Sequence, residues 1–198
     1  MKCNYVAIER EYGSGGSLIA ARLAEEWGIP CYGREILEEV ARKKKVSVDQ
    51  IERYEEKATS SVLYTIYMMS CAHTGNSDML SGEGRIYVEE QAVIREMAAK
   101  GPAIFLGHCA AEALKDKKGV LKVFIRSDAR KKQGRIREQY GIAEDQIETE
   151  RKRFDRKRSN YYHANTGLDW NDMKNYDIVL DSGTLGTEGC VTVLKGLR

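Results

Sequence analysis

The chain has 198 residues, of which 42% are hydrophobic and 31% are charged, and its formal net charge is +2. The hydrophobic fraction is enough for a core and excludes general disorder, while the length fits one domain with small appendages. The near-neutral charge by itself requires neither a nucleic acid nor an acidic membrane as partner. No apolar run approaches the ~20 residues of a membrane-spanning helix, and the N-terminus lacks a signal peptide's apolar core, so we expect no membrane partner.

The five cysteines are scattered, and no pair of them has the C-x-x-C spacing of a metal or redox site. An odd number of scattered cysteines is typical of reduced thiols, so we expect a cytoplasmic protein. The three histidines form no local metal-ligand motif.

In chain order, the first predicted strand covers residues 4–8, and a glycine-rich turn leads from it to a helix over about 17–27. An extended segment at 29–32 precedes a helix over 34–45, whose apolar residues recur on one face. A capping box at 47–50 opens a third helix. Residues 62–69 are apolar and predicted helical, 73–84 form a polar loop, and 85–100 form another helix.

The second half alternates strands with helices. Strands are predicted at 103–106, 120–125 and 176–180, and helices at 109–115, 127–140, 143–163 and 187–195, with a loop at 165–174. This alternation predicts a parallel sheet covered on both faces, with ligands beyond the carboxyl ends of its strands. The segments 34–100 and 143–174 are too long for simple crossovers, so we expect two insertions over that ligand edge.

The strand, glycine turn and helix within residues 6–23 have the local architecture of a phosphate-binding site, in which loop N–H groups and the helix N-terminus face an anion. Against the pattern G-x-x-x-x-G-K-[ST], Arg10 stands at the first glycine and Gly16 at the lysine, so two of four positions match. The alternative is a glycine turn that only closes a βα unit. The phosphate-binding candidates are Gly13, Ser14, Gly15, Gly16 and Ser17.

Phosphoryl transfer needs a cation near the bridge between the β- and γ-phosphates, and Gly16 cannot supply it. Arg10 is the nearest candidate in the sequence, because it leaves the first strand at the mouth of the loop. The alternative is that Arg10 pairs with Glu9, Glu11 or an acid of the second insertion and only shapes the loop.

Residues 148–158, ETERKRFDRKR, are strongly basic. Arg151, Asp155 and Arg158 recur at helical spacing on one face, where two guanidiniums could clamp phosphate oxygens and the carboxylate could hold their planes. The alternatives are a solvated helix face and a nucleic-acid patch, and the few interleaved aromatics argue against the latter. Together with the glycine turn, the pattern favours a phosphate lid.

Four blocks of the sequence, in order, resemble the cytidylate kinase-like family of P-loop nucleoside monophosphate kinases. They are EREYGSGGSLIAARLAEEWGIPCYGREIL, IFLGHCA, VFIRSDARKKQGRI and FDRKRSNYYHANTGLDWNDMKNYDIVLDSGTLG. The resemblance implies a single P-loop kinase-like α/β domain, with a parallel sheet flanked by helices. Its core would be about 1–32, 101–142 and 175–198, with a helical substrate insertion at about 33–100 and a helical lid at about 143–174.

The resemblance also implies transfer of a phosphoryl group from ATP to a nucleoside monophosphate, with ATP and Mg²⁺ as cofactors and small-molecule nucleotides as partners. Spacing and resemblance together give three groups of site residues. The expected catalytic residues are Arg10, Arg151, Asp155 and Arg158. Arg135 and Gly13–Ser17 are expected to bind ATP, with Mg²⁺ on the Ser17 hydroxyl. The expected substrate-binding residues are Tyr32, Arg34 and His108.

The chain departs from the family pattern at several of these positions. Gly33 stands where an aspartate usually follows the tyrosine, and His108 stands where an arginine is expected to contact the acceptor. Histidine cannot reproduce the bidentate fork of arginine. Alternatively, His108 is only a residue at the end of a strand, with its ring hydrogen-bonded to a backbone carbonyl. The alternative function is therefore a catalytically degenerate nucleotide-binding regulatory protein, and the oligomeric state stays open.

Overall fold

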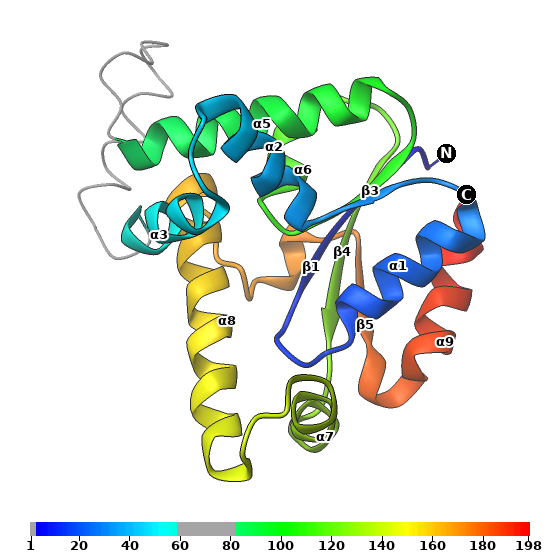
Figure 1. Cartoon of the computed structure of the whole chain (residues 1–198). Helices are drawn as coiled ribbons and strands as arrows, with labels where there is room; N and C mark the ends of the chain where they lie inside the picture. Colours follow the sequence, from blue (N-terminus) through cyan, green and yellow to red (C-terminus); the bar gives the residue numbers. More distant parts are fainter. Residues whose placement is uncertain (1–2, 59–81) are drawn as a thin grey trace.

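Five parallel strands form the centre of the molecule in the order β2-β3-β1-β4-β5 (Figure 1). The computed structural model describes residues 3–58 and 82–198. Within these ranges the strands are β1 (Tyr5–Arg10), β2 (Cys31–Tyr32), β3 (Ala103–Leu106), β4 (Val120–Arg126) and β5 (Ile178–Asp181). The strand that carries the glycine-rich turn, β1, therefore lies in the middle, paired with β3 on one side and β4 on the other.

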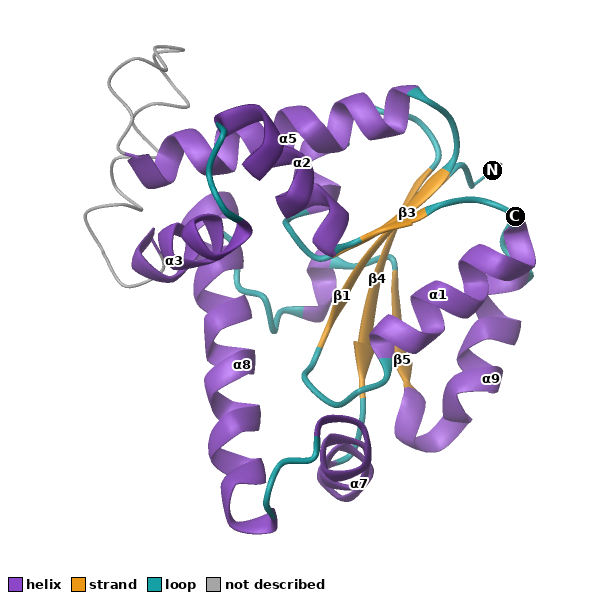
Figure 2. Ribbon diagram, in the orientation of Figure 1, coloured by secondary structure: helices purple, strands orange, loops and turns teal. Residues whose placement is uncertain are grey.

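Helices cover both faces of this sheet (Figure 2). They are α1 (Gly16–Trp27), α2 (Arg34–Lys44), α3 (Val48–Ala58), α5 (Gly82–Ala99), α6 (Ala110–Ala113), α7 (Ala129–Tyr140), α8 (Glu144–Thr166) and α9 (Ser182–Lys195), with a 3₁₀ turn at Met173–Asn175. Helices α1 and α9 pack side by side on one face, while α2, α5 and α6 cover the other (Figure 1).

Alternate strand residues enter two separate apolar layers. Val6, Ile8 and Ile104 pack against α1 and α9, whereas Ala7 and Phe105 pack against α2 and α5. Because both faces of the sheet are covered, its strands are continuous apolar runs rather than alternating ones. The predicted α/β class and parallel sheet are confirmed, and the predicted 34–100 segment contributes helices to a face of the sheet.

Two predicted boundaries differ from the structure. Residues 82–84, predicted as the end of a loop, form the first turn of α5. Ile86, Val93 and Ile94 of this helix pack in the core. This packing overrides the low helix propensity of the glycines in its first turn. Helix α9 begins at Ser182 instead of 187, because the Asp181 carboxylate accepts hydrogen bonds from two N–H groups of its first turn. The predicted helix at 62–69 lies outside the described residues.

The carboxyl ends of β1, β3 and β4 meet at one edge of the sheet. The glycine-rich turn leaves β1 there, residues 107–109 leave β3, and α7 and α8 lie beyond the same edge (Figure 1). This edge of a doubly wound sheet is where ligands bind, and it brings together segments far apart in the sequence. In the described part of the chain, none of the helices is both long and apolar enough to span a bilayer.

Phe105→Ala tests the placement of β3 in the core. The Phe105 side chain is fully buried between the sheet and the helices of the second layer, so its truncation should cost about 3–5 kcal/mol. Urea unfolding followed by circular dichroism measures this loss. As a control, Leu185→Ala changes an exposed side chain of α9, and should stay within about 0.5 kcal/mol of the parent. A Phe105→Ala cost below that of the control would contradict the fold.

Candidate active site

The glycine loop, Gly13–Ser17, is shaped to bind an anion. Gly13 and Gly15 have φ angles of 75° and 78°, a left-handed conformation that a β-branched residue rarely adopts. The N–H groups of Gly13, Gly15 and Ser17 donate to no acceptor among residues 3–58 and 82–198. They stand at the N-terminus of α1, where the helix dipole favours negative charge. The loop can therefore bind phosphate without a lysine.

Arg135 on α7 supports the loop from its outer side. Its Nη1 donates to the Ser14 carbonyl at 3.0 Å, to the Gly13 carbonyl at 3.3 Å and to Ser182 Oγ at 3.1 Å. Ser182 Oγ in turn donates to the Ser14 carbonyl at 2.5 Å. Arg135 thus ties the glycine loop to the start of α9. Its predicted contact with ATP would be additional to these bonds, which already hold the loop in shape.

Glu11 and Lys132 form a second support that the sequence analysis missed. The Glu11 carboxylate accepts hydrogen bonds from Ser127 N and from Lys132 Nζ, each at 2.9 Å. The Lys132 side chain is only 7% exposed, so this ion pair is shielded from solvent and holds the end of β1 against α7. A glutamate beside a glycine turn and a lysine 121 positions later carry no pattern that could have identified the pair.

Helix α8 turns the predicted face of Arg151, Asp155 and Arg158 toward the loop. Asp155 Oδ1 accepts a hydrogen bond from Tyr12 N at 2.6 Å, and its Oδ2 lies 3.4 Å from Arg151 Nη1. Arg158 Nη1 donates to the Arg10 carbonyl at 3.0 Å. The structure thus brings these three residues together at the mouth of the glycine loop.

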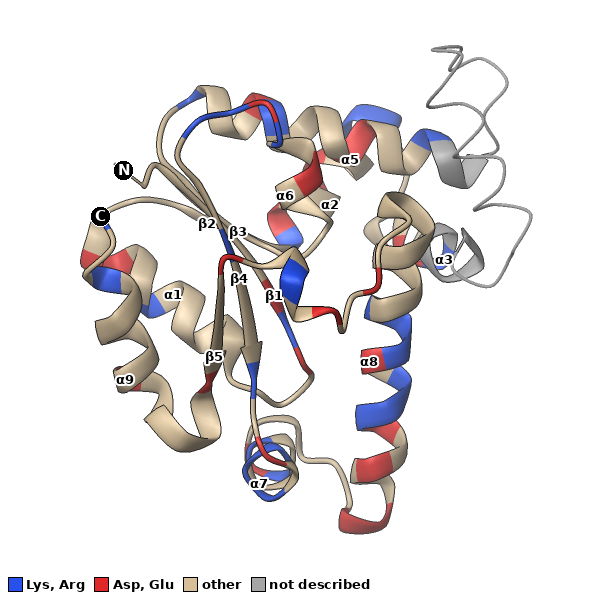
Figure 3. Ribbon diagram, turned by 180° about the vertical axis from the view of Figure 1, so that it is seen from behind, with Lys and Arg blue, Asp and Glu red and all other residues tan. Residues whose placement is uncertain are grey.

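Helix α8 carries both basic and acidic residues along its length (Figure 3). Lys152 pairs with Glu148 at 3.3 Å, and Arg153 pairs with Glu150 at 2.7 Å. Two bases of this stretch are thus paired with carboxylates of the same helix, and the expectation that nucleic acid is not the partner stays a prediction.

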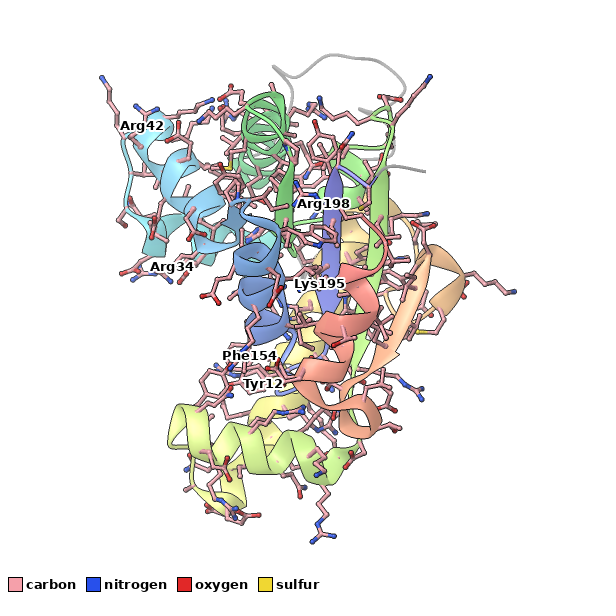
Figure 4. All side chains as sticks on the ribbon, turned by 90° about the vertical axis from the view of Figure 1, so that its right-hand side faces the viewer. Tyr12, Arg34, Arg42, Phe154, Lys195 and Arg198 are labelled. Atoms are coloured by element: carbon pink, nitrogen blue, oxygen red, sulfur yellow. The ribbon has the colours of Figure 1, made fainter. Side chains whose placement is uncertain are left out.

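Three aromatic rings join the loop to both helices. The Tyr12 ring stacks on Phe154 of α8 at a centroid distance of 4.3 Å and on Tyr140 of α7 at 5.1 Å. Figure 4 shows Tyr12 and Phe154 side by side at this end of the molecule. The Arg158 guanidinium lies over the Tyr12 ring, 5.7 Å from its centroid. Helix α8 is thus held to the loop by stacking, a charged hydrogen bond and a cation–π contact.

The Arg10 side chain runs between two glycines. A Cβ on Gly16 would lie 2.7 Å from Arg10 Cβ and 2.9 Å from its Cγ, and a Cβ on Gly107 would overlap Arg10 Nη1. Arg10 and Gly16 are therefore coupled departures from the G-x-x-x-x-G-K-[ST] pattern, because the Arg10 stem fills the space that a side chain at residue 16 would need. The guanidinium itself lies against the turn after β3.

A cavity of about 180 Å³ opens between the ends of β1 and β3 and helix α8. We refer to it as the β1–β3 cavity. Its lining is Glu9, Arg10, Gly107, His108, Cys109, Phe154, Lys157, Arg158, Tyr161 and Tyr162. The Glu9 carboxylate accepts a hydrogen bond from Trp170 Nε1 at 3.3 Å, and burial raises the pKa of this carboxyl. Glu9 and Trp170 are site residues that the sequence analysis did not identify.

Of the three predicted substrate residues, His108 lines the β1–β3 cavity, and Tyr32 and Arg34 are not part of its lining. His108 Nδ1 lies 3.7 Å from the buried Glu90 carboxylate, which accepts a hydrogen bond from the Tyr161 hydroxyl. Tyr32 packs its ring on Phe105 at 5.6 Å. Arg34 is 61% exposed and pairs with carboxylates of its own helix and of α3, and Figure 4 shows it apart from Tyr12 and Phe154. Their roles toward a substrate stay predictions.

The family model of the cytidylate kinase-like family matches residues 5–184, and the chain belongs to this family. A comparison with curated protein sequences gives no significant match. The chain is similar to the crystal structure of an uncharacterized protein from Eubacterium ventriosum ATCC 27560, at 26% identity and a TM-score of 0.71, covering 98% of this chain and 97% of the other.

More distant solved structures share the fold. Shikimate kinase from Bacteroides thetaiotaomicron is 12% identical with a TM-score of 0.55, and the match covers 98% of this chain and 97% of the other. A sugar kinase from Janibacter sp. HTCC2649 is 13% identical with a TM-score of 0.52, over 98% and 94% of the two chains. These likenesses confirm the predicted P-loop kinase fold and carry no information on the substrate of this chain.

Exchanging residues 10 and 16 tests their coupling. Gly16→Lys alone should cost about 1–3 kcal/mol, because its Cβ collides with the Arg10 stem. Arg10→Gly in addition should remove that collision, so the double variant should be more stable than the sum of the single effects by roughly 0.5–3 kcal/mol. Urea unfolding of the four proteins measures the coupling. Gly134→Lys, at a helical glycine with open space around its Cβ, controls for adding a lysine. Strict additivity would show that the two positions are independent.

Asp155→Ala tests the attachment of α8. The substitution removes the acceptor of Tyr12 N, so amide hydrogen exchange should become faster at residues 12–17 and over the middle of α8. The matched control is Asp145→Ala, which removes an exposed carboxylate from the first turn of the same helix. Exchange rates at 12–17 that are equal in the two variants would mean that Asp155 does not hold the loop.

Proposed function

We propose that the protein transfers the γ-phosphoryl group of ATP to a nucleoside monophosphate. The observation that supports this most strongly is the adjacency of two anion-binding features, the unpaired N–H groups of the glycine loop and the guanidiniums of Arg10 and Arg158 in the β1–β3 cavity. Transfer joins an acceptor oxygen to the γ-phosphorus while the bond to the β-phosphate oxygen breaks and ADP leaves. Two phosphate groups must therefore be held close together.

On the donor side, the N–H groups of Gly13, Gly15 and Ser17 would bind the β-phosphate, with Arg135 holding the loop carbonyls away from it. The family implies Mg²⁺, and the residues present fit this ion. The Ser17 hydroxyl is exposed beside the loop N–H groups, and Mg²⁺ commonly takes only one or two protein ligands and fills its shell with phosphate oxygens and water. When bound, the ion would neutralise charge between the phosphates.

On the lid side, Arg151 and Arg158 would neutralise the charge that the transferred group carries in the transition state. Arg151 is held by Glu148 at 2.7 Å and by Asp155 at 3.4 Å, so its guanidinium is already oriented toward the loop. We propose that residues 143–174 act as the lid and that residues 33–100 contribute the acceptor side. Opening of α8 would break its contacts with Tyr12 and admit nucleotides.

The alternative is a catalytically degenerate nucleotide-binding regulator. It is favoured by the absence of the loop lysine, by the ion pair of Arg34 with Glu52, and by the position of His108 beside the Glu90 carboxylate. An ADP-release assay with ATP, Mg²⁺ and CMP, dCMP, UMP, AMP or GMP separates the two functions. If the protein is a kinase, one of these monophosphates should raise the rate of ADP release above the rate with ATP alone, and the rise should depend on its concentration. Tight ATP binding without acceptor-dependent turnover would favour the regulator.

Gly15→Val tests the donor site. Valine cannot adopt the left-handed conformation of Gly15 without strain, so the loop N–H groups should turn away and ADP affinity should fall about 100-fold or more, the loss of roughly 3 kcal/mol of charge-assisted hydrogen bonds. Calorimetric titration with ADP measures the loss. Gly141→Val is the matched control, because Gly141 has a φ of 63° but caps α7 with open space around its Cβ. Equal ADP affinity in the two variants would remove the loop from the donor site.

A further inference from the structure

The position of the Arg10 guanidinium distinguishes a donor-side role from an acceptor-side role. Arg10 leaves β1 beside the glycine loop, yet its stem passes Gly16 and its Nη1 ends against Gly107, in the turn after β3. A cation that serves only the β- and γ-phosphates would be expected over the loop N–H groups. The Arg10 guanidinium instead lines the β1–β3 cavity, beside the turn that follows the neighbouring strand β3.

The Arg10 guanidinium is buried beside a second guanidinium. Arg10 Nε is buried and has no hydrogen-bond partner among the described residues. Arg158 faces the same cavity, and burial together with this second guanidinium lowers the pKa of Arg10. The carboxylate of the same lining is that of Glu9. Cations are placed together at such a cost when an anion is to bind between them.

We propose that Arg10 binds the phosphate of the acceptor, together with Arg158, in the β1–β3 cavity. The proposal rests on the proposed function and assigns Arg10 to the acceptor instead of the donor. Guanidinium forks bind phosphate oxygens bidentately, and Gly107 leaves the space in which the Arg10 fork lies. The ligand group that follows is a phosphate monoester, which in the proposed function is that of a nucleoside monophosphate.

The test compares each monophosphate with its own nucleoside. CMP, UMP and AMP are titrated calorimetrically against cytidine, uridine and adenosine, so that each pair differs only in the phosphate, and ADP reports on the donor site. Arg10→Met keeps an unbranched stem between Gly16 and Gly107 and removes the charge. Arg10→Met should weaken binding of the monophosphate that the parent recognises, by about tenfold or more. Its affinities for the nucleoside and for ADP should change less than about twofold. Arg156→Met, on the exposed part of α8, should change none of them.

Gly107→Ala provides a second, independent variant. Its Cβ would displace Arg10 Nη1, so it should cause the same selective loss in the parent and a smaller loss in the Arg10→Met background. If Arg10→Met does not fold, Arg10→Lys retains the charge and should still weaken the monophosphate, because a lysine cannot form the bidentate fork.

The proposal is overturned if Arg10→Met weakens ADP as much as the monophosphate, if it changes neither, or if the parent binds no monophosphate more tightly than its nucleoside. Because binding is measured without turnover, the two proposals fail separately. Arg10-dependent CMP binding in a protein without ADP release would reject the kinase and keep the inference. Acceptor-dependent ADP release by the parent, together with an Arg10→Met variant that loses affinity for ADP alone, would keep the kinase and reject the inference.

Discussion

The site depends on the space that two missing side chains leave for Arg10. Gly16 and Gly107 come from different segments, and a Cβ on either would meet the Arg10 side chain. The arginine can therefore run from the end of β1 to the end of β3 within the packed sheet edge. Because interiors are close-packed, no small adjustment could admit a side chain at these positions while the guanidinium stays where it is. A lysine at position 16 is therefore incompatible with the observed position of the Arg10 stem.

The other contacts of the site hold this arrangement in place. Arg135 fixes the carbonyls of the glycine loop, and Glu11 fixes the end of β1 to α7 through Lys132. Asp155 holds the N–H of Tyr12, whose ring also stacks on Phe154. These groups turn the loop carbonyls outward and leave its N–H groups available, so the loop is preorganised for an anion before one binds.

The two sides of the site differ in their electrostatics. The glycine loop offers backbone dipoles, whereas the β1–β3 cavity offers full charges with Glu9 as the carboxylate of its lining. Trp170, from the segment after α8, donates to Glu9 and so links the proposed lid segment to the end of β1. A movement of α8 and the segment after it would therefore act on both the glycine loop and the cavity, through Asp155 in one case and Trp170 in the other.

Much of this protein could be predicted from its sequence, because the informative signals are local. Apolar runs such as 103–106 identified buried strands, the glycines after β1 identified the loop, and helical spacing put Arg151, Asp155 and Arg158 on one face. What only the tertiary structure decided is where long side chains end. The tip of Arg10 lies at Gly107, and Glu11 meets Lys132 across 121 positions. Such pairings depend on which strands are neighbours and on packing at single atoms, and neither is encoded in the spacing of residues along the chain.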